Sequence, residues 1–561
     1  MKQLHTPPLG ARAIASEGSA GAGTPTLVIV GLGLFIALLD ATIVNIALPA
    51  MMKDFGIGIT QVSWVLNAYN LAFVTLLLTG GKLADQFGRR RMYLLGVLGF
   101  VALSVACALA PNAGWLIAFR ALQGLAGALL VPATLALVVA AFPRERLGVG
   151  IGAWSAIGAL ASALGPALGG IITQTLSWRW IFWVNLPVGL AALGLAVQFL
   201  KESRDPTTES HIDFLGILTI SAGLFGLSLA LIQAGDWGWR SPRFLSLLIG
   251  ATLAVIAWIV VESHARMPMV DLGIFHNQTF SAGTSVMFAV GFGMITAIFF
   301  VPQFLVNISG FSEVNAGLAI TPTPLVVMVV GGFVAGRLYH RIGPRVPTLI
   351  GVLLAAAGLL SLSTLRAGGG WKEVFLPLAI LGAGIGLALI PAGTAAMDAL
   401  PPAGTGVASG VLTASRQIGI IFGVAVLVAI LNSQLSNRTS STKSEMRFAV
   451  LNSSLPPPIK EVMVGRLSAI GNLNDSEAVR KLLSTPLPDG LPPALRPEMM
   501  RVGADLRKAV KGGSTEAFDA TFRFGAAGVL LLGLVPSLFL KRPNLVRPRR
   551  VSASPSRVLP S

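Results

Sequence analysis

The chain has 561 residues, of which 54% are hydrophobic and only 12% are charged. A soluble domain carries about twice that charged fraction, so the composition excludes an ordinary soluble protein. The net charge of +17 fits the basic cytoplasmic loops of a membrane protein better than nucleic-acid binding, and we expect no nucleic-acid partner.

Long apolar runs follow one another along the chain, separated by short polar and basic connectors. Runs of about 20 residues can cross a bilayer core about 30 Å thick. They are continuous in Leu, Ala, Gly, Val and Ile and do not alternate, so they predict helices and not a barrel. We expect about fourteen spans, near residues 26–50, 62–80, 92–110, 115–139, 150–172, 180–200, 213–233, 242–262, 279–305, 314–335, 346–366, 373–397, 406–432 and 518–540.

These spans divide the chain into seven expected parts. The first apolar run is too long for a signal-peptide core, so it is predicted to be an uncleaved span. The parts are a disordered cytoplasmic tail (1–25), a six-helix bundle (26–200), two inserted spans with linkers (201–262), most of a second bundle (263–432), an extracytoplasmic segment (433–516), the last span (517–541) and a basic cytoplasmic tail (542–561).

The extracytoplasmic segment is polar but is not featureless. Residues 458–470, 475–484 and 495–511 have the spacing of amphipathic helices. The third of these helices is expected to end at Gly512-Gly513.

Basic residues in the short loops predict that both termini are cytoplasmic, in the plasma membrane. With that orientation the inside loops hold twelve basic residues: Lys82, Arg89, Arg90, Arg91, Arg144, Arg146, Lys201, Arg204, Arg266, Arg337, Arg341 and Arg345. The outside short loops hold only six: Lys53, Arg179, Arg240, Arg243, Arg366 and Lys372.

Two stretches of the chain are related in sequence. Residues 81–91 read Gly-Lys-Leu-Ala-Asp-Gln-Phe-Gly-Arg-Arg-Arg, and residues 336–345 read Gly-Arg-Leu-Tyr-His-Arg-Ile-Gly-Pro-Arg. Each follows a span that leaves the membrane on the cytoplasmic side, which predicts two related halves. The copies lie eight spans apart and not six, so an extra pair of spans, 213–233 and 242–262, is expected between the halves.

The first copy is suited to a close connection between helices. Gly81 and Gly88 permit a tight turn and close approach, and Asp85 can meet a neighbouring helix end or Arg89, four residues on. Alternatively, the arginines only set the topology. The second copy has His340 in place of Asp85, so an equivalent contact is not expected there.

The first span contains Asp40 close to its middle, within Leu-Asp-Ala-Thr-Ile-Val-Asn-Ile-Ala-Leu-Pro at 39–49. A charge at that depth costs about 2.5–3.5 kcal/mol to insert, so it should face a cavity or a partner. Desolvation favours the neutral form of a carboxyl group, as a proton carrier requires. The alternative is a carboxylate that only joins two helices by hydrogen bonds.

The fourth span contains Arg120, about one turn inside the outer boundary marked by Trp115. Either Arg120 extends to that interface, or it pairs with a carboxylate in the cavity. Gln123 lies on the same helix face, three residues on.

The fifth span carries a cluster of small residues around a proline. Proline interrupts the backbone hydrogen-bond ladder, and small residues let helices approach and slide. Ordinary small-residue packing is the alternative. The cluster consists of Gly158, Gly165, Pro166, Gly169 and Gly170.

Together with Trp178-Arg179-Trp180 and the residues up to Gly189, these stretches resemble the major facilitator superfamily, specifically its fourteen-span drug:proton antiporter branch (EmrB/QacA type). The resemblance covers nearly all of residues 26–432 and the last span. It implies an all-α integral membrane fold, with two six-helix bundles plus two extra central spans. It also implies proton-coupled efflux of small lipophilic or amphiphilic compounds by alternating access.

The resemblance also implies roles for particular residues. Arg120 matches an arginine implicated in proton coupling, and Asp40 would carry or gate the proton. Gly81, Asp85, Gly88 and Arg89 match a cytoplasmic latch between the halves. The cluster around Pro166 matches a motif characteristic of antiporters.

A substrate cavity is expected between the two halves. Each candidate side chain is alternatively a packing or lipid-facing residue. The candidates are Thr42, Asn45, Trp64, Tyr69, Gln123, Phe300 and Arg416.

No phosphate-binding loop and no zinc or iron ligand cluster is evident in the sequence, so we expect no ATP-driven pump, no enzyme and no cofactor. The single cysteine, Cys107, excludes an intrachain disulfide. Expected partners are a small-molecule substrate, protons and the lipid bilayer, with a periplasmic adaptor on segment 433–516 as a further hypothesis. The rival functions are a permease of the same fold for a metabolite, siderophore or amino acid, and a membrane receptor or scaffold.

Overall fold

The computed structural model describes residues 23–143, 146–204, 213–265, 268, 270–400, 405–469 and 495–541. Most of the two predicted tails and the helix expected at 475–484 lie outside these residues. Within them, fourteen helices are long and apolar enough to cross a membrane, and no strand is present. The predicted all-α membrane fold is therefore confirmed.

The first half of the chain forms one bundle and the second half another. The first bundle contains α1 (Gly23–Phe55), α2 (Ile59–Phe87), α3 (Arg89–Ala108), α4 (Ala113–Ala141), α5 (Leu147–Thr175), α6 (Trp180–Trp183) and α7 (Asn185–Phe199). The second contains α10 (Gln278–Phe304), η4 (Leu305–Ser309), α11 (Glu313–Ala319), α12 (Pro322–Val329), η5 (Val330–Ala335), α13 (Gly336–Ile342), α14 (Arg345–Leu362), α15 (Trp371–Asp398), α16 (Thr405–Leu451) and α19 (Arg496–Ser537).

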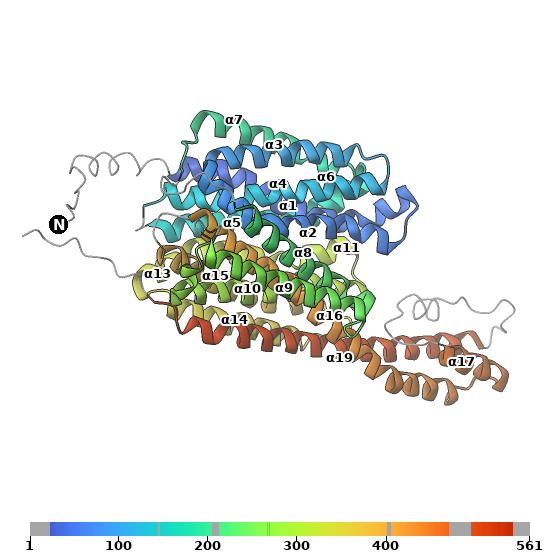
Figure 1. The fold of residues 1–561 in the computed structure, drawn as a ribbon. Coiled ribbons are helices and arrows are strands. Elements are labelled where there is room, and N and C mark those ends of the chain that lie inside the picture. The colour runs from blue at the N-terminus through green and yellow to red at the C-terminus, as the bar shows by residue number, and fades with distance from the viewer. Residues whose placement is uncertain are drawn as a thin grey trace, which may run out of the picture.

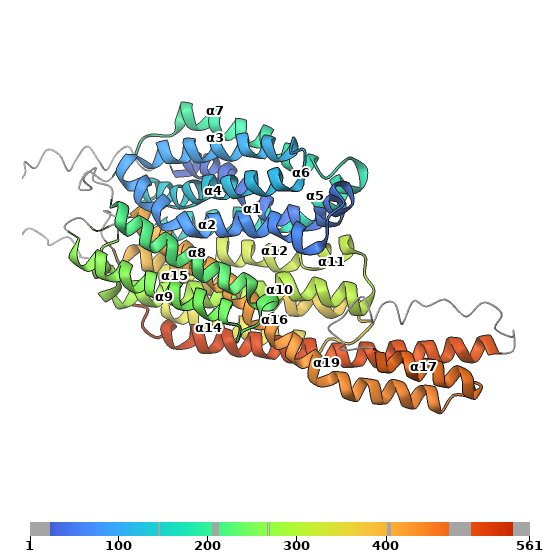
Figure 2. The ribbon, with the colours of Figure 1, turned by 45° about the vertical axis from the view of Figure 1, so that its right-hand side comes forward.

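The inserted pair is α8 (Phe214–Trp237) and α9 (Pro242–His264), followed by the short helix η3 (Leu272–His276). It lies at the seam of the two bundles, where α8 packs on α2 of the first and on α16 of the second (Figures 1 and 2). We call the end of the bundles where α1 begins and α19 ends the base, and the opposite end the apex. Figure 1 shows the base on the left and the apex on the right.

A helical hairpin projects from the apex (Figure 1). It consists of the outer parts of α16 and α19 together with α17 (Pro457–Ala469). Its own apolar core is separate from the core of the bundles and contains Met446, Val450, Leu455, Leu467, Val502, Leu506 and Val510.

The hairpin corrects part of the sequence prediction. A helix was expected to end at Gly512-Gly513, but α19 runs unbroken from the hairpin to Ser537. Likewise α16 continues beyond residue 432 as far as Leu451. A helix glycine costs only about 1 kcal/mol, which packing between two long helices can offset. The predicted helix at 458–470 is confirmed by α17.

The two related sequence stretches end helices at the base. The first closes α2 and the second forms α13, so both are helical up to the second glycine of the repeat. Gly88 and Gly343 then adopt φ angles of 106° and 83°, which residues with side chains rarely adopt. The chain can therefore turn sharply into α3 and α14.

Candidate functional site

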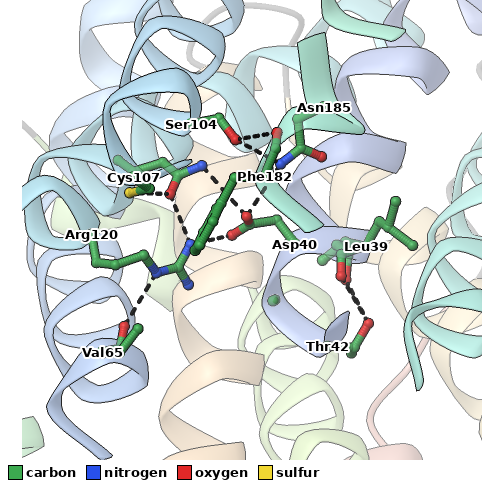
Figure 3. Close-up of polar contacts among 12 residues, drawn as sticks. Leu39, Asp40, Thr42, Val65, Ser104, Cys107, Arg120, Phe182 and Asn185 are labelled. Carbon is green, nitrogen blue, oxygen red and sulfur yellow. Dashed lines mark hydrogen bonds and ion pairs between the residues drawn. The ribbon is translucent and has the colours of Figure 1, made fainter. Parts of the chain in front are cut away.

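Asp40 and Arg120 form a buried ion pair inside the first bundle (Figure 3). Asp40 lies on α1 and Arg120 on α4, and each side chain is 0% exposed. The predicted partner for Asp40 is thus a guanidinium from a neighbouring helix. Arg120 pairs with this carboxylate and does not extend to the membrane interface.

Amide side chains complete the surroundings of the Asp40 carboxylate. Asn185 Nδ2, from α7, donates to Asp40 Oδ1 at 3.2 Å, and Gln123 Nε2 donates to the same oxygen at 3.5 Å. Arg120 Nη1 also donates to Gln123 Oε1 at 2.8 Å. Ser104 Oγ accepts from Asn185 at 2.9 Å and donates to a backbone carbonyl. Four helices therefore hold this charge pair.

The Arg120 guanidinium is also fixed from other sides. Its Nε donates to the Val65 carbonyl at 3.2 Å, and its central carbon lies 4.3 Å from the centre of the Tyr69 ring. A cation above an aromatic face is stabilised electrostatically. Among the described residues, Arg120 Nη2 is buried without a hydrogen-bond partner. The charge pair is thus rigidly placed but not fully satisfied.

Helix α1 connects this pair to the glycine–proline cluster of α5. Thr42, two residues after Asp40, lies so close to Gly165 that a Cβ atom there would overlap the Thr42 side chain. A Cβ on Gly169 would come within 2.9 Å of the Ile43 carbonyl, and one on Gly158 within 2.7 Å of Leu38. Gly170 is buried on the same helix. The small residues are therefore required by the close packing of α1 and α5.

On its other side, α5 packs against the second bundle. A Cβ on Gly317 of α11 would lie 2.9 Å from Pro166, and one on Gly152 would lie 2.9 Å from the Gly331 carbonyl. Gly331 belongs to η5, a π-helical turn, and such turns are frequent at functional sites. Helix α5 thus joins the charge pair's helix to the opposite half.

The predicted latch residues meet the second bundle at the base. Asp85 accepts hydrogen bonds from Arg89 at 2.9 and 3.2 Å, and from the backbone N–H of Val407 at 3.0 Å. Val407 lies in the first turn of α16, where unpaired N–H groups and the helix dipole favour an anion. Gly81 and Gly406 allow the two backbones to approach closely. Both contacts expected for Asp85 are present.

The second copy of the repeat contacts the first bundle differently. A Cβ on Gly148 of α5 would lie 3.5 Å from His340 and 3.6 Å from Gly336. In place of a carboxylate at the facing helix, the Tyr339 hydroxyl donates to Asp398 of its own bundle at 2.5 Å. The second copy therefore has no carboxylate at the position that corresponds to Asp85.

A small cavity lies between the bundles, with about 30 Å³ of room for the centre of a water-sized sphere. Of the predicted cavity residues only Arg416 lines it. The other six do not line it. Two of them, Gln123 and Tyr69, are buried beside Asp40, and Phe300 is buried in the apolar core. Thr42 packs on α5, Trp64 is half-buried and Asn45 is exposed. Within the described residues there is no cluster of three or more metal-binding side chains.

Asn185 and Ser104 of the charge pair were not among the residues predicted from the sequence. Asn185 stands between three tryptophans and a proline, which indicated only an interfacial anchor. An amide inside an otherwise apolar span was the available signal, because buried polar groups need partners.

Comparison with known proteins places this arrangement in a family. Residues 30–424 match the model of the Major Facilitator Superfamily. The tetracenomycin C resistance and export protein of Streptomyces glaucescens is 36% identical over 435 residues, 78% of this chain and 81% of that protein. The multidrug resistance protein Stp of Mycobacterium tuberculosis (strain H37Rv) is 36% identical over 414 residues, 73% of this chain and 76% of that protein.

Solved structures show the same fold. The human organic anion transporter MFSD10 superposes with a TM-score of 0.52 and 17% identity, covering 73% of this chain and 93% of that one. The proton:xylose symporter XylE gives the same TM-score at 15% identity, covering 72% and 88%. With fourteen apolar helices in two bundles, and with relatives that confer antibiotic resistance or export, the chain belongs to the major facilitator superfamily.

Proposed function

We propose that the protein exports small lipophilic or amphiphilic compounds in exchange for protons, with Asp40 as the proton-binding group. The observation that carries this proposal is the buried pair of Asp40 and Arg120, since ionisable residues inside a membrane are costly and generally mark functional sites. The similar proteins from Streptomyces glaucescens and Mycobacterium tuberculosis support drug export as the class of transport.

Protonation of Asp40 would leave the Arg120 charge without its counterion. Breaking one side of a buried ion pair costs about 3–5 kcal/mol, enough to favour a different packing of the helices that hold it. Helix α1 passes that change to α5 through the contact of Thr42 with Gly165. Helix α5 passes it to the second bundle through Pro166 and Gly317.

In this proposal the base faces the cytoplasm, as the charges of the short loops predict. The contact of Asp85 with Val407 then closes the cytoplasmic end and must open before substrate enters from that side. An envelope adaptor that binds the apex hairpin remains a prediction from the sequence.

The test is substrate-dependent proton flux in liposomes that contain a pH-sensitive dye. The substrate panel includes puromycin and tetracenomycin C, because relatives are named for resistance to them. We expect Asp40→Asn to abolish the coupled flux. Asp54→Asn is the matched control, since Asp54 is a partly exposed carboxylate on the same helix outside the pair.

Two results would contradict the proposal. Undiminished coupled flux in Asp40→Asn would exclude Asp40 as the proton carrier. Movement of substrate that does not respond to an imposed pH gradient in the wild-type protein would exclude proton coupling altogether.

A further inference from the structure

The cavity between the bundles has walls from both halves of the protein. Helices α4 and α5 contribute Leu135, Ile151, Trp154 and Ser155, and α10, α15 and α16 contribute the others. A compound held there would contact both bundles at once. It is therefore placed where relative movement of the bundles would change its access to either side.

Arg416 is the one charged side chain among the residues that line this cavity. The walls around it are mostly Leu, Ile, Met and Trp, with hydroxyl groups only on Ser155 and Thr413. Thr413 already donates its hydroxyl hydrogen to the Ser409 carbonyl at 2.8 Å. The guanidinium thus lies against an apolar cavity about eleven residues, or roughly 16 Å, inside the first turn of α16.

The charge of Arg416 is not compensated within the described residues, where its side chain makes no hydrogen bond or ion pair. The buried carboxylates among the described residues form hydrogen bonds with other partners and not with Arg416. Asp40 pairs with Arg120, Asp85 with Arg89, and Glu262 accepts from Trp258 at 2.9 Å. A partly buried cation without a counterion inside a membrane protein is costly, and an anion brought by a ligand would reduce that cost.

We propose that the cavity binds compounds that combine an anionic group with an apolar body, with Arg416 as the counterion of the anionic group. A guanidinium presents a planar fork of donors that fits a carboxylate or a similar oxyanion. The Leu, Ile, Met and Trp side chains contact the apolar body and exclude water from the ion pair. This proposal rests on the proposed function and names the substrate class for it.

The test compares three naphthalene compounds that differ mainly in charge. They are 1-naphthaleneacetate, the neutral 1-naphthaleneacetamide and the cationic 1-naphthalenemethylamine. Their binding to the purified protein in lipid nanodiscs is measured by calorimetry. The measurement is made at pH 7.5, because the carboxylate of 1-naphthaleneacetate is ionised at that pH. We expect the carboxylate to bind at least ten-fold more tightly than the amide, and the ammonium compound most weakly.

The variant Arg416→Gln should remove this preference while changing the affinity for the amide less than two-fold. Arg416→Lys should keep part of it, because the charge remains but the planar fork is lost. Arg523→Gln is the matched control. Arg523 is a cation in the same bundle, does not line the cavity, and donates to Ser363 Oγ at 3.5 Å.

Equal affinity for the three compounds, absence of carboxylate binding at millimolar concentration, or an unchanged preference in Arg416→Gln would overturn the proposal. If Arg416→Gln does not fold, the selectivity of the wild-type protein and of Arg416→Lys decides. These measurements use no pH gradient. Loss of proton coupling would therefore leave the selectivity unchanged, and loss of selectivity would leave the coupled flux of a neutral substrate unchanged.

Discussion

The Asp40 carboxylate and the Arg120 guanidinium form an ion pair from which water is excluded. Such a pair adds little to stability compared with a well-packed apolar pair, but removal of one partner leaves a buried unpaired charge. The pair is therefore suited to a group that must change its charge during a cycle, since protonation has a large effect on its surroundings.

We predict that Arg120→Gln destabilises the protein by about 3–5 kcal/mol, because it leaves the Asp40 carboxylate unpaired. The double variant Asp40→Asn with Arg120→Gln should recover part of this loss, since neither charge remains. Denaturant unfolding in detergent of the two single variants and the double variant measures the coupling. Strictly additive effects would show that the two residues do not interact.

A second carboxylate on α1 has the opposite character, because it is partly exposed at the apex. Arg179 donates to Asp54 at 2.6 Å and Trp178 at 3.1 Å, and these hydrogen bonds hold the pKa of Asp54 below its usual value. This clamp is outside the membrane-spanning part of α1. The Asp54 carboxylate should therefore stay ionised in a mildly acidic medium.

The pH dependence follows from the direction of this pKa shift. A carboxylate with a lowered pKa in the folded state stabilises fully above its unfolded pKa of about 3.9 and loses its effect as pH falls through the lowered value. We predict a small loss of thermal stability in Asp54→Asn that is the same at pH 7 and at pH 5. A loss that disappears already at pH 5 would contradict the assignment.

At the scale of elements, the close packing of α1 and α5 depends on positions without side chains. We predict that Gly165→Ala lowers transport at least ten-fold, because the new methyl group overlaps Thr42 and separates the two helices. Adding Thr42→Ala should restore part of the activity. Gly194→Ala on α7 is the control, since a Cβ there meets no atom within 4 Å.

The helices themselves were predictable from the sequence, because long apolar runs have no alternative to helix in a bilayer. The sequence also predicted that Asp40 has a partner, because a charge in the middle of a span is costly. The identity of that partner was not predictable, because the depth of Arg120 in its span permits both pairing and extension to the interface. Asn185 was missed because neighbouring tryptophans gave a sufficient explanation of its stretch, and Gly512-Gly513 was misjudged because packing overrides local propensity.

At the scale of the whole molecule, the apolar core of the apex hairpin is separate from the apolar clusters of the membrane-spanning helices. We predict that Leu506→Asp opens the hairpin to proteases without unfolding the bundles, because Leu506 is buried only in the hairpin core. Limited proteolysis with mass spectrometry locates the cuts. Leu451→Asp, at a side chain 47% exposed, is the control and should stay resistant. Cuts throughout the bundles in Leu506→Asp would show a single cooperative unit.

Helix α16 runs unbroken from the contact of Asp85 with Val407 to the apex hairpin. Its 47 residues extend about 70 Å at ~1.5 Å per residue. If this helix turns as a rigid rod by roughly 10° about its base end when Asp85 releases Val407, its far tip moves by about 12 Å. A small movement at one face of the membrane would thereby produce a larger displacement at the other face. A pair of fluorophores, one on the hairpin and one on the bundle, would report that displacement during each transport cycle.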